Sequence, residues 1–200
     1  HLYCDYNNLT TLDVSQNTAL IYLYCDFNQL TDLDVSNNTS LLWLSCGLNY
    51  LTSLDVSNNS LLSFLSCSYN YPLTSLDVSN NTNLNVLYCN NISSEALDIS
   101  NNTNLNSLNC SNSLLSTLDV SNNTSLNVLY CSGNYLETLD LKQNINLFKL
   151  YCSENQLISL DLRNGNNTNM TEFNIGMNSS LSCINVDDAT YSTANWTLTN

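Results

Sequence analysis

Basic residues, histidine, glycine and proline are nearly missing from this chain. Its 200 residues include only 3 Lys and Arg, 1 His, 4 Gly and 1 Pro, and its formal net charge is -14. A phosphate backbone would be repelled by such a surface, so the composition argues against nucleic acid as a partner. No apolar run reaches the roughly 18 residues of a membrane-spanning helix and no leader peptide is visible, so we expect no membrane insertion.

Recognisable catalytic and metal-binding patterns are also missing. The single histidine is His1, so a Cys–His pair would depend on the first residue. There is no G-x-S-x-G, no phosphate-binding glycine loop and no H-E-x-x-H. The recurring aspartates occupy equivalent positions, whereas acid and base roles need different environments. We therefore predict a protein with no enzymatic activity, no catalytic residues, no cofactor and no metal site.

A repeat of 21 residues runs through almost the whole chain. One unit reads L-x-x-L-x-C-x-x-N-x-L-x-x-L-D-V-S-x-N-x-x, and Pro72 adds the one extra residue found between two units. The recurring residues are Cys4, Cys25, Cys46, Cys67, Cys89, Cys110, Cys131 and Cys152, and Asp13, Asp34, Asp55, Asp77, Asp98, Asp119, Asp140 and Asp161. A period near 20 residues with leucines at this spacing predicts a leucine-rich repeat solenoid of about eight to nine coils.

Each unit contains two segments that alternate like β-strands. In x-L-x-C and again in L-D-V, the Leu, Cys and Val residues are predicted to point inward and the Asp outward. The expected fold is therefore a repeat rich in β-structure, with a parallel sheet on the concave face and short extended segments opposite. Ile92 and Ser113 replace the asparagine of the unit, so we expect local irregularity in the middle, and Gly165 is expected to adopt a positive φ.

The repeated unit resembles the 21-residue, cysteine-bearing class of bacterial leucine-rich repeats, including the internalin J type and flavobacterial surface proteins. The resemblance covers practically the whole chain. It implies a curved parallel solenoid on an exported protein that binds or adheres, and hence a secreted or cell-surface location. The segment "LSCINVDDATYSTANWT" also resembles the end of such repeats. We therefore assign residues 1–178 to the solenoid, with a truncated first repeat, and residues 179–200 to the last half-repeat and a partial C-terminal cap.

The eight periodic cysteines are predicted to be buried free thiols. Neighbouring Cβ atoms in a parallel stack lie about 4.8 Å apart, beyond the disulfide range of about 3.5–4.5 Å. A straight column without a C-x-x-C pair also does not converge on a metal ion. Cys183 differs, because its alignment with Ser75 places it at an outward position. It is the candidate for a disulfide with another molecule.

Asparagines and aspartates of the repeat are given structural roles. The first Asn of each unit is expected to hydrogen-bond the backbone at a bend. The aspartates repel one another along their row, so each is expected to accept hydrogen bonds from the following S-x-N turn. A row of bound cations is the other interpretation, which the scarcity of glycine disfavours for calcium.

Aromatic residues gather on the predicted concave face. The two residues that flank the inward leucine of each x-L-x-C segment should point to solvent, and clustered exposed aromatics commonly mark an interface. The candidate partner-binding residues are Tyr3, Tyr22, Tyr24, Trp43, Phe64, Tyr88, Tyr130 and Tyr151, with Asp5 and Asp26 at the edge of the N-terminal group. The other interpretation is that these rings only stabilise the sheet by stacking.

Two functions follow as hypotheses. The first is an extracellular recognition or adhesion module that binds a protein or a carbohydrate on a cell surface through the concave aromatic face. The second is a structural subunit that stacks end to end into a surface filament, because the uncapped ends of a solenoid favour self-association.

Overall fold

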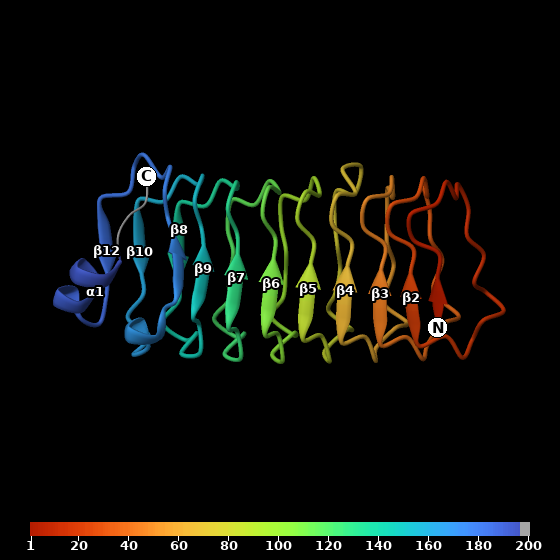
Figure 1. Ribbon diagram of the computed structural model, residues 1–200, viewed down its shortest axis with the longest axis horizontal. Helices are drawn as coiled ribbons and strands as arrows, with labels where there is room; N and C mark the ends of the chain where they lie inside the picture. Colours follow the sequence, from red (N-terminus) through yellow and green to blue (C-terminus); the bar gives the residue numbers. More distant parts are fainter. Residues whose placement is uncertain (197–200) are drawn as a thin grey trace.

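The chain winds into a solenoid of about nine coils, stacked side by side along the long axis (Figure 1). The computed structural model describes residues 1–196, and the end of the segment assigned to the cap, residues 197–200, lies outside the described residues. Each coil contributes one short strand to a parallel sheet of nine strands, which we call the nine-stranded face. The predicted leucine-rich repeat solenoid is confirmed.

The strands of the nine-stranded face follow one another in chain order, with β9 and β11 after β7. Neighbours pair in register one repeat apart, as Leu23 pairs with Leu44 and Leu44 with Leu65. The strands are β1 (Leu2–Tyr3), β2 (Tyr22–Tyr24), β3 (Trp43–Ser45), β4 (Phe64–Ser66), β5 (Val86–Tyr88), β6 (Ser107–Asn109), β7 (Val128–Tyr130), β9 (Lys149–Tyr151) and β11 (Glu172–Asn174).

The opposite side carries the L-D-V segments, and a second sheet forms only near the C-terminal end. Its three parallel strands are β8 (Thr138–Asp140), β10 (Ser159–Asp161) and β12 (Cys183–Asn185). Two short helices, η1 (Asn167–Asn169) and α1 (Ala189–Asn195), lie at the same end. None of the helices within residues 1–196 is long and apolar enough to cross a membrane.

The core consists of columns of leucine, valine and cysteine, and each coil adds several leucines, one cysteine and one valine or an aliphatic residue in its place. Leu23, Leu44 and Leu65 are fully buried, and so are the valines of the L-D-V segments from Val35 onward. Full burial of such a side chain stabilises the fold by about 1.5–3 kcal/mol. Because each coil covers the leucines of its neighbours, a coil is stable only within the stack.

The cysteine column is unpaired, and all its members except the partly exposed Cys4 are buried, as predicted. Cys25, Cys46 and Cys67 have no exposed surface, and all nine cysteines are free thiols. The Sγ atoms of Cys25 and Cys46 lie 3.4 Å from carbonyl oxygens of the next coil. Burial raises the pKa of the Cys67 thiol to about 12, so the interior thiols stay protonated and unreactive at neutral pH.

The bend asparagines bond the backbone as expected. Asn49 Nδ2 donates to the carbonyls of Cys25 and Cys46 at 3.0 and 3.1 Å, and its Oδ1 accepts from Leu30 N–H at 3.0 Å. Ile92 has no such amide, and Leu73 N–H bonds to the Asn70 carbonyl instead. The bend at Ser113 is irregular as well, since its buried hydroxyl has no hydrogen-bond partner among the described residues, but β5, β6 and β7 keep their register.

A second asparagine column lies inside the solenoid and was not predicted as buried. Each of these side chains is fully buried and donates to two carbonyls of the preceding coil; Asn59, for example, bonds Val35 and Asn38 at 3.0 Å. The members are Asn38, Asn59, Asn81, Asn102, Asn123 and Asn144. This column supplies hydrogen bonds to the turns that the S-x-N motif makes.

Candidate functional site

The N-terminal half of the nine-stranded face carries a continuous chain of aromatic rings, which we call the first row. Ring centroids lie 4.8 Å apart in the Tyr3–Tyr24 pair and 5.8 Å apart in the Tyr24–Trp43 pair. Trp43 and Phe64 stack at 3.6 Å with 4° between their planes, and Phe64 meets Tyr88 edge-on at 5.7 Å. These five residues come from β1 to β5 and form one surface.

Tyr22 lies on the same strand as Tyr24 and is adjacent to this row. It pairs in register with Trp43 across β2 and β3, and its ring stacks on His1 at 4.4 Å.

The two remaining candidate tyrosines are separate from the first row. Tyr130 and Tyr151 have ring centroids 5.0 Å apart, but β6, with Ser107 and Asn109, lies between them and Tyr88. The Tyr151 hydroxyl donates to Glu172 Oε2 at 2.6 Å. Glu172 also forms an ion pair with Lys149, so the acid of this second group is already neutralised.

A second apolar row, which the sequence reasoning missed, runs beside the first. Tyr6, Phe27, Leu48 and Tyr69 each stand two residues after a repeat cysteine, and their side chains are 71%, 42%, 36% and 39% exposed. The rings of Tyr6 and Phe27 stack at 4.2 Å. The signal was present in the sequence, because this position holds large apolar residues in the first four repeats, then Asn91, Asn112, Gly133 and Glu154, and a large apolar residue again only at Met177.

The backbone of the second row is left-handed at every member. The φ angles of Tyr6, Phe27, Leu48 and Tyr69 are 54°, 53°, 52° and 58°. A bulky residue in this region is strained by about 1–2 kcal/mol, whereas Gly and Asn tolerate it. Local stability would therefore favour the Asn or Gly found in the middle coils, and the run of large side chains in the first four coils needs another explanation.

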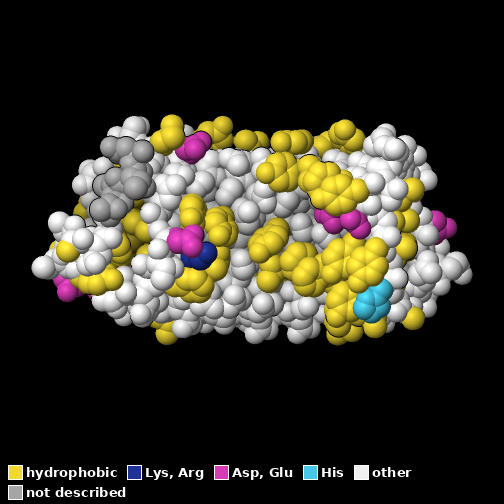
Figure 2. All heavy atoms as spheres, viewed as in Figure 1, with side chains coloured by type: hydrophobic (Ala, Val, Ile, Leu, Met, Phe, Trp, Pro, Cys, Tyr) yellow, Lys and Arg dark blue, Asp and Glu magenta, His cyan; other side chains and the backbone are white. Residues whose placement is uncertain are grey.

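Two aspartates lie between the rows. Asp5 and Asp26 follow Cys4 and Cys25 on successive coils, so each stands between a first-row and a second-row residue. Figure 2 shows acidic side chains between two hydrophobic areas in the half that carries the histidine. This acid pair with its two flanking rows is the candidate site.

Asp26 is held in place by the next coil. Its Oδ1 accepts a hydrogen bond from Gly47 N–H at 2.8 Å. A Cβ on Gly47 would lie 2.9 Å from Ser68 O and 3.1 Å from Asp26 Oδ1, so glycine is needed for this approach. Burial raises the pKa of the Asp26 carboxyl, and the charge of Asp5 adds to the increase.

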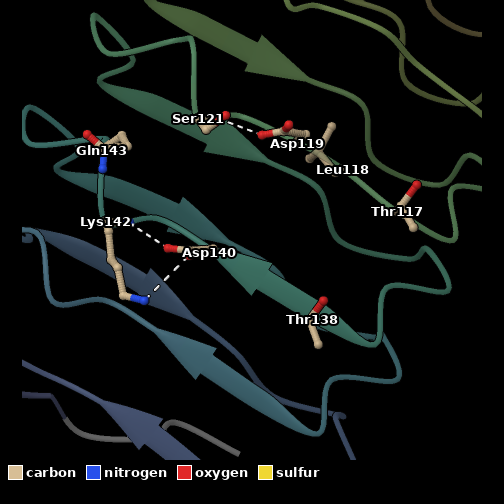
Figure 3. A pocket seen from close by; sticks show the side chains of 8 residues that line it. All are labelled: Thr117, Leu118, Asp119, Ser121, Thr138, Asp140, Lys142 and Gln143. Carbon is tan, nitrogen blue, oxygen red and sulfur yellow. Dashed lines mark hydrogen bonds and ion pairs between the residues drawn. The ribbon is translucent and has the colours of Figure 1, made fainter.

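The opposite face is polar, and its carboxylates are occupied by their own turns. A groove of about 380 Å³ lies between two coils there, lined by Thr117, Asp119, Thr138 and Asp140 among others (Figure 3). Asp119 Oδ1 accepts from Ser121 N–H at 2.9 Å, and five earlier aspartates repeat this bond. Hydrogen bonds from the serine lower the pKa of the Asp119 carboxyl. The predicted turn interpretation of the Asp row is thus confirmed.

Within residues 1–196, no three His, Cys, Asp or Glu side chains gather where they could hold a metal ion.

Comparison with solved structures identifies the family. The functional domain of InlJ from Listeria monocytogenes, which includes a cysteine ladder, is 36% identical; the match covers 92% of this chain and 43% of that chain, with a TM-score of 0.77. The interior cysteine column described above is the same feature. The chain belongs to the cysteine-containing leucine-rich repeats of the internalin J type. It spans less than half of the InlJ chain.

Two more distant structures show the fold alone. InlF, an internalin of Listeria monocytogenes, is 23% identical, with 91% of this chain and 58% of that chain covered and a TM-score of 0.73. The ectodomain of the Arabidopsis thaliana receptor kinase GASSHO1/SCHENGEN3 is 21% identical, with coverage of 80% and 21% and a TM-score of 0.70. No protein-family model and no curated protein matches the chain. None of these structures indicates an enzyme family.

Cys183 lies outside the cysteine ladder of this leucine-rich repeat. It begins β12 and pairs in register with Ser159 of β10, which corresponds to Ser75 of an earlier repeat. Its side chain is exposed and unpaired in the chain. A disulfide from Cys183 to another molecule stays a prediction.

Proposed function

We propose that this leucine-rich repeat is a non-catalytic, extracellular recognition module that binds a protein partner through the N-terminal half of its nine-stranded face. The observation that carries the proposal is the unbroken chain of rings from Tyr3 to Tyr88, joined by the exposed second row. Large contiguous apolar surfaces are unfavourable in water and mark interaction sites. Aromatic residues also dominate the energetics of protein interfaces.

Sheet stabilisation alone does not account for these rings. β6 carries Ser107 and Asn109 at the outward positions and still pairs in register with β5 and β7. β9 likewise carries Lys149 at the position that Trp43 and Phe64 hold in β3 and β4. The sheet therefore forms without a continuous ring chain, and a purely structural role would not confine that chain to one half.

A preformed face also lowers the entropy that binding must overcome. The strands are fixed by the leucine core beneath them and by the neighbouring coils, so few backbone angles need to be ordered on contact. The distant receptor ectodomain GASSHO1/SCHENGEN3 was solved in complex with CASPARIAN STRIP INTEGRITY FACTOR 2. At that identity the likeness shows the fold alone, yet it illustrates that such a solenoid can hold a protein ligand.

The test is an array of extracellular proteins and glycans probed with the wild-type chain and with a Tyr24→Ala/Trp43→Ala variant. We expect a protein that binds the wild type and loses at least about tenfold in affinity with the variant, since two hot-spot aromatics are removed. A matched Thr117→Ala/Thr138→Ala variant on the polar face should bind normally. A glycan as the sole ligand would contradict the protein partner. Concentration-dependent rods in light scattering, unaffected by the aromatic variant, would favour the filament.

A further inference from the structure

The N-terminal coils carry negative charge that no basic residue of the chain offsets. Residues 1–141 contain 12 Asp and Glu and no Lys or Arg, whereas residues 142–200 contain 5 acids and all 3 bases, which divides the net charge into -12 and -2. Every ion pair among the described residues uses Lys142, Lys149 or Arg163. The candidate site therefore lies in a field that attracts cations.

Asp5 and Asp26 concentrate this charge within an apolar surface. Each lies between a ring of the first row and a ring of the second, with Tyr3 and Tyr6 around Asp5 and Tyr24 and Phe27 around Asp26. Two carboxylates on adjacent coils repel each other when no cation lies between them. Apolar surroundings strengthen both this repulsion and the attraction of a cationic group that replaces water there.

The chemistry of this surface selects among cationic ligands. A bare metal ion needs more oxygen ligands than two carboxylates supply, and it gains nothing from the rings. A basic side chain fits both parts, because its aliphatic stem packs on an aromatic face while its charged head pairs with a carboxylate. Arginine suits this best, since its planar guanidinium stacks on rings and binds a carboxylate through two hydrogen bonds.

We propose that the partner presents a basic segment to the candidate site, in which Arg or Lys side chains alternate with apolar ones. The basic side chains bind Asp5 and Asp26, and the apolar side chains pack on the two rows. Gly47 is a positioning residue here, because it lets the next coil approach and hold Asp26. The inference rests on the proposed recognition function and specifies the partner's chemistry.

The test uses a synthetic peptide that alternates Arg and Leu, and the same peptide with citrulline in place of Arg. Citrulline keeps the length and planarity of the side chain and removes the charge. Affinities are measured by fluorescence polarisation against the wild type and against Asp5→Asn/Asp26→Asn. The matched control is Asp55→Asn/Asp77→Asn, which removes the same charge from exposed positions on the opposite face. Thermal unfolding of all three proteins establishes that they fold equally.

We expect the Arg peptide to bind the wild type at least about tenfold tighter than the citrulline peptide, as charge-assisted hydrogen bonds require. Asp5→Asn/Asp26→Asn should abolish that preference, and the control variant should keep it. Equal binding of both peptides, no binding, or equal loss in the two double variants would each overturn the proposal. An array partner that needs Trp43 but tolerates Asp5→Asn/Asp26→Asn would overturn the basic segment and leave the recognition function standing.

Discussion

The two ends of the nine-stranded face use the same strands for different surfaces. Around β9 and β11, Glu172 is matched by Lys149 and by the Tyr151 hydroxyl, so charge and hydrogen bonds are satisfied within the chain. Around β1 and β2, Asp5 and Asp26 have no basic partner in the described chain and lie between exposed rings. Figure 2 shows the one dark blue area beside an acid and among hydrophobic side chains, apart from the larger hydrophobic areas in the half that carries the histidine.

The difference indicates which end of the face pairs its acids within the chain and which end leaves its acids available to a partner. A surface that only needs to be stable and soluble pairs its acids and keeps Asn or Gly where the backbone is left-handed. The C-terminal coils satisfy the first condition at Glu172, which pairs with Lys149, and the second only at Gly133, since Glu154 and Met177 hold the left-handed position of the last coils. The N-terminal coils satisfy neither, which is the pattern expected when a surface serves binding at some expense in stability.

The largest expected effect comes from comparing alanine substitutions in the first row with alanine substitutions in the Tyr130–Tyr151 pair. Tyr24→Ala/Trp43→Ala should weaken partner binding by about a hundredfold, whereas Tyr130→Ala/Tyr151→Ala should change it less than about threefold. Surface plasmon resonance with the partner found in the array would measure both. Equal losses would mean that the whole face binds and that the two ends do not differ in function.

A smaller effect is expected from substitutions at the left-handed position two residues after each repeat cysteine. Gly133→Ala should destabilise the fold by about 1–2 kcal/mol, because φ is +68° there and the new Cβ would lie 2.1 Å from Asn112 Oδ1. Phe27→Asn should instead leave stability unchanged or raise it by up to about 1 kcal/mol, since Asn tolerates this backbone. The same Phe27→Asn change should weaken partner binding. Urea unfolding of the two variants, read by tyrosine fluorescence, would measure the stabilities; a large loss in Phe27→Asn would show that the second row is structural.

The pH dependence should differ between the two faces. Burial raises the folded-state pKa of Asp26 above its ordinary 3.8, so its contribution to stability falls as the pH rises from 3.8 through the folded value. The titratable groups near it are Asp5, Tyr24 and the thiols of Cys4, Cys25 and Cys46, and the charge of Asp5 adds to the increase. A cationic ligand needs the ionised form of Asp26. As the pH is lowered, the affinity for this ligand should therefore begin to fall while the pH is still above 3.8.

The row of aspartates on the opposite face has the reverse sign. Hydrogen bonds from the following serines lower the folded-state pKa of Asp34 and Asp55 below 3.8, so their contribution is present above 3.8 and is lost as the pH falls through the lower value. Titration of peptide binding against pH, in the wild type and in Asp26→Asn, isolates the contribution of the Asp26 carboxyl to affinity. A profile that Asp26→Asn does not alter would contradict the role given to this carboxyl.

The smallest effect is expected at the C-terminal end, where Glu172 is paired with Lys149 within the chain. Glu172→Gln removes the ion pair with Lys149, and because the pair is partly exposed the change should lower stability less than Gly133→Ala does. Partner binding should be unaffected. A thermal melt with the same variant in high salt is the measurement; a loss as large as that of Gly133→Ala would mean that the C-terminal coils depend on the pair more than its exposure indicates.

Periodicity was sufficient to predict the coil, the inward columns and the turn role of the aspartates. Each of these depends on a local rule: alternation places Leu44 and Cys46 inside, and the backbone two residues after Asp55 places Ser57 N–H on its carboxylate. The first row followed from the same alternation. Placement of Cys183 on the outside followed from aligning one repeat with another.

The second row and the second asparagine column could not be reached by that rule. Phe27 stands just past the strand, where a left-handed residue ends the alternation and turns the side chain back to the same surface. In S-N-N turns the two asparagines are the same letter, yet Asn37 is exposed and Asn38 is fully buried. Burial of Asp26 depends on Gly47 of the next coil, which is a contact between repeats that no single repeat encodes.

The order in which the thiols of the cysteine ladder react with a labelling reagent reports how the solenoid unfolds. Seven of the ladder's thiols have at most 1% of their surface exposed and Cys4 is partly exposed, whereas Cys183, outside the ladder, is exposed. An alkylating reagent reaches an interior thiol only after the coils that cover it have separated, so the order in which the seven are labelled gives the order in which neighbouring coils come apart. Because each of these coils has one such cysteine, the labelling of each side chain measures the local unfolding of its own coil.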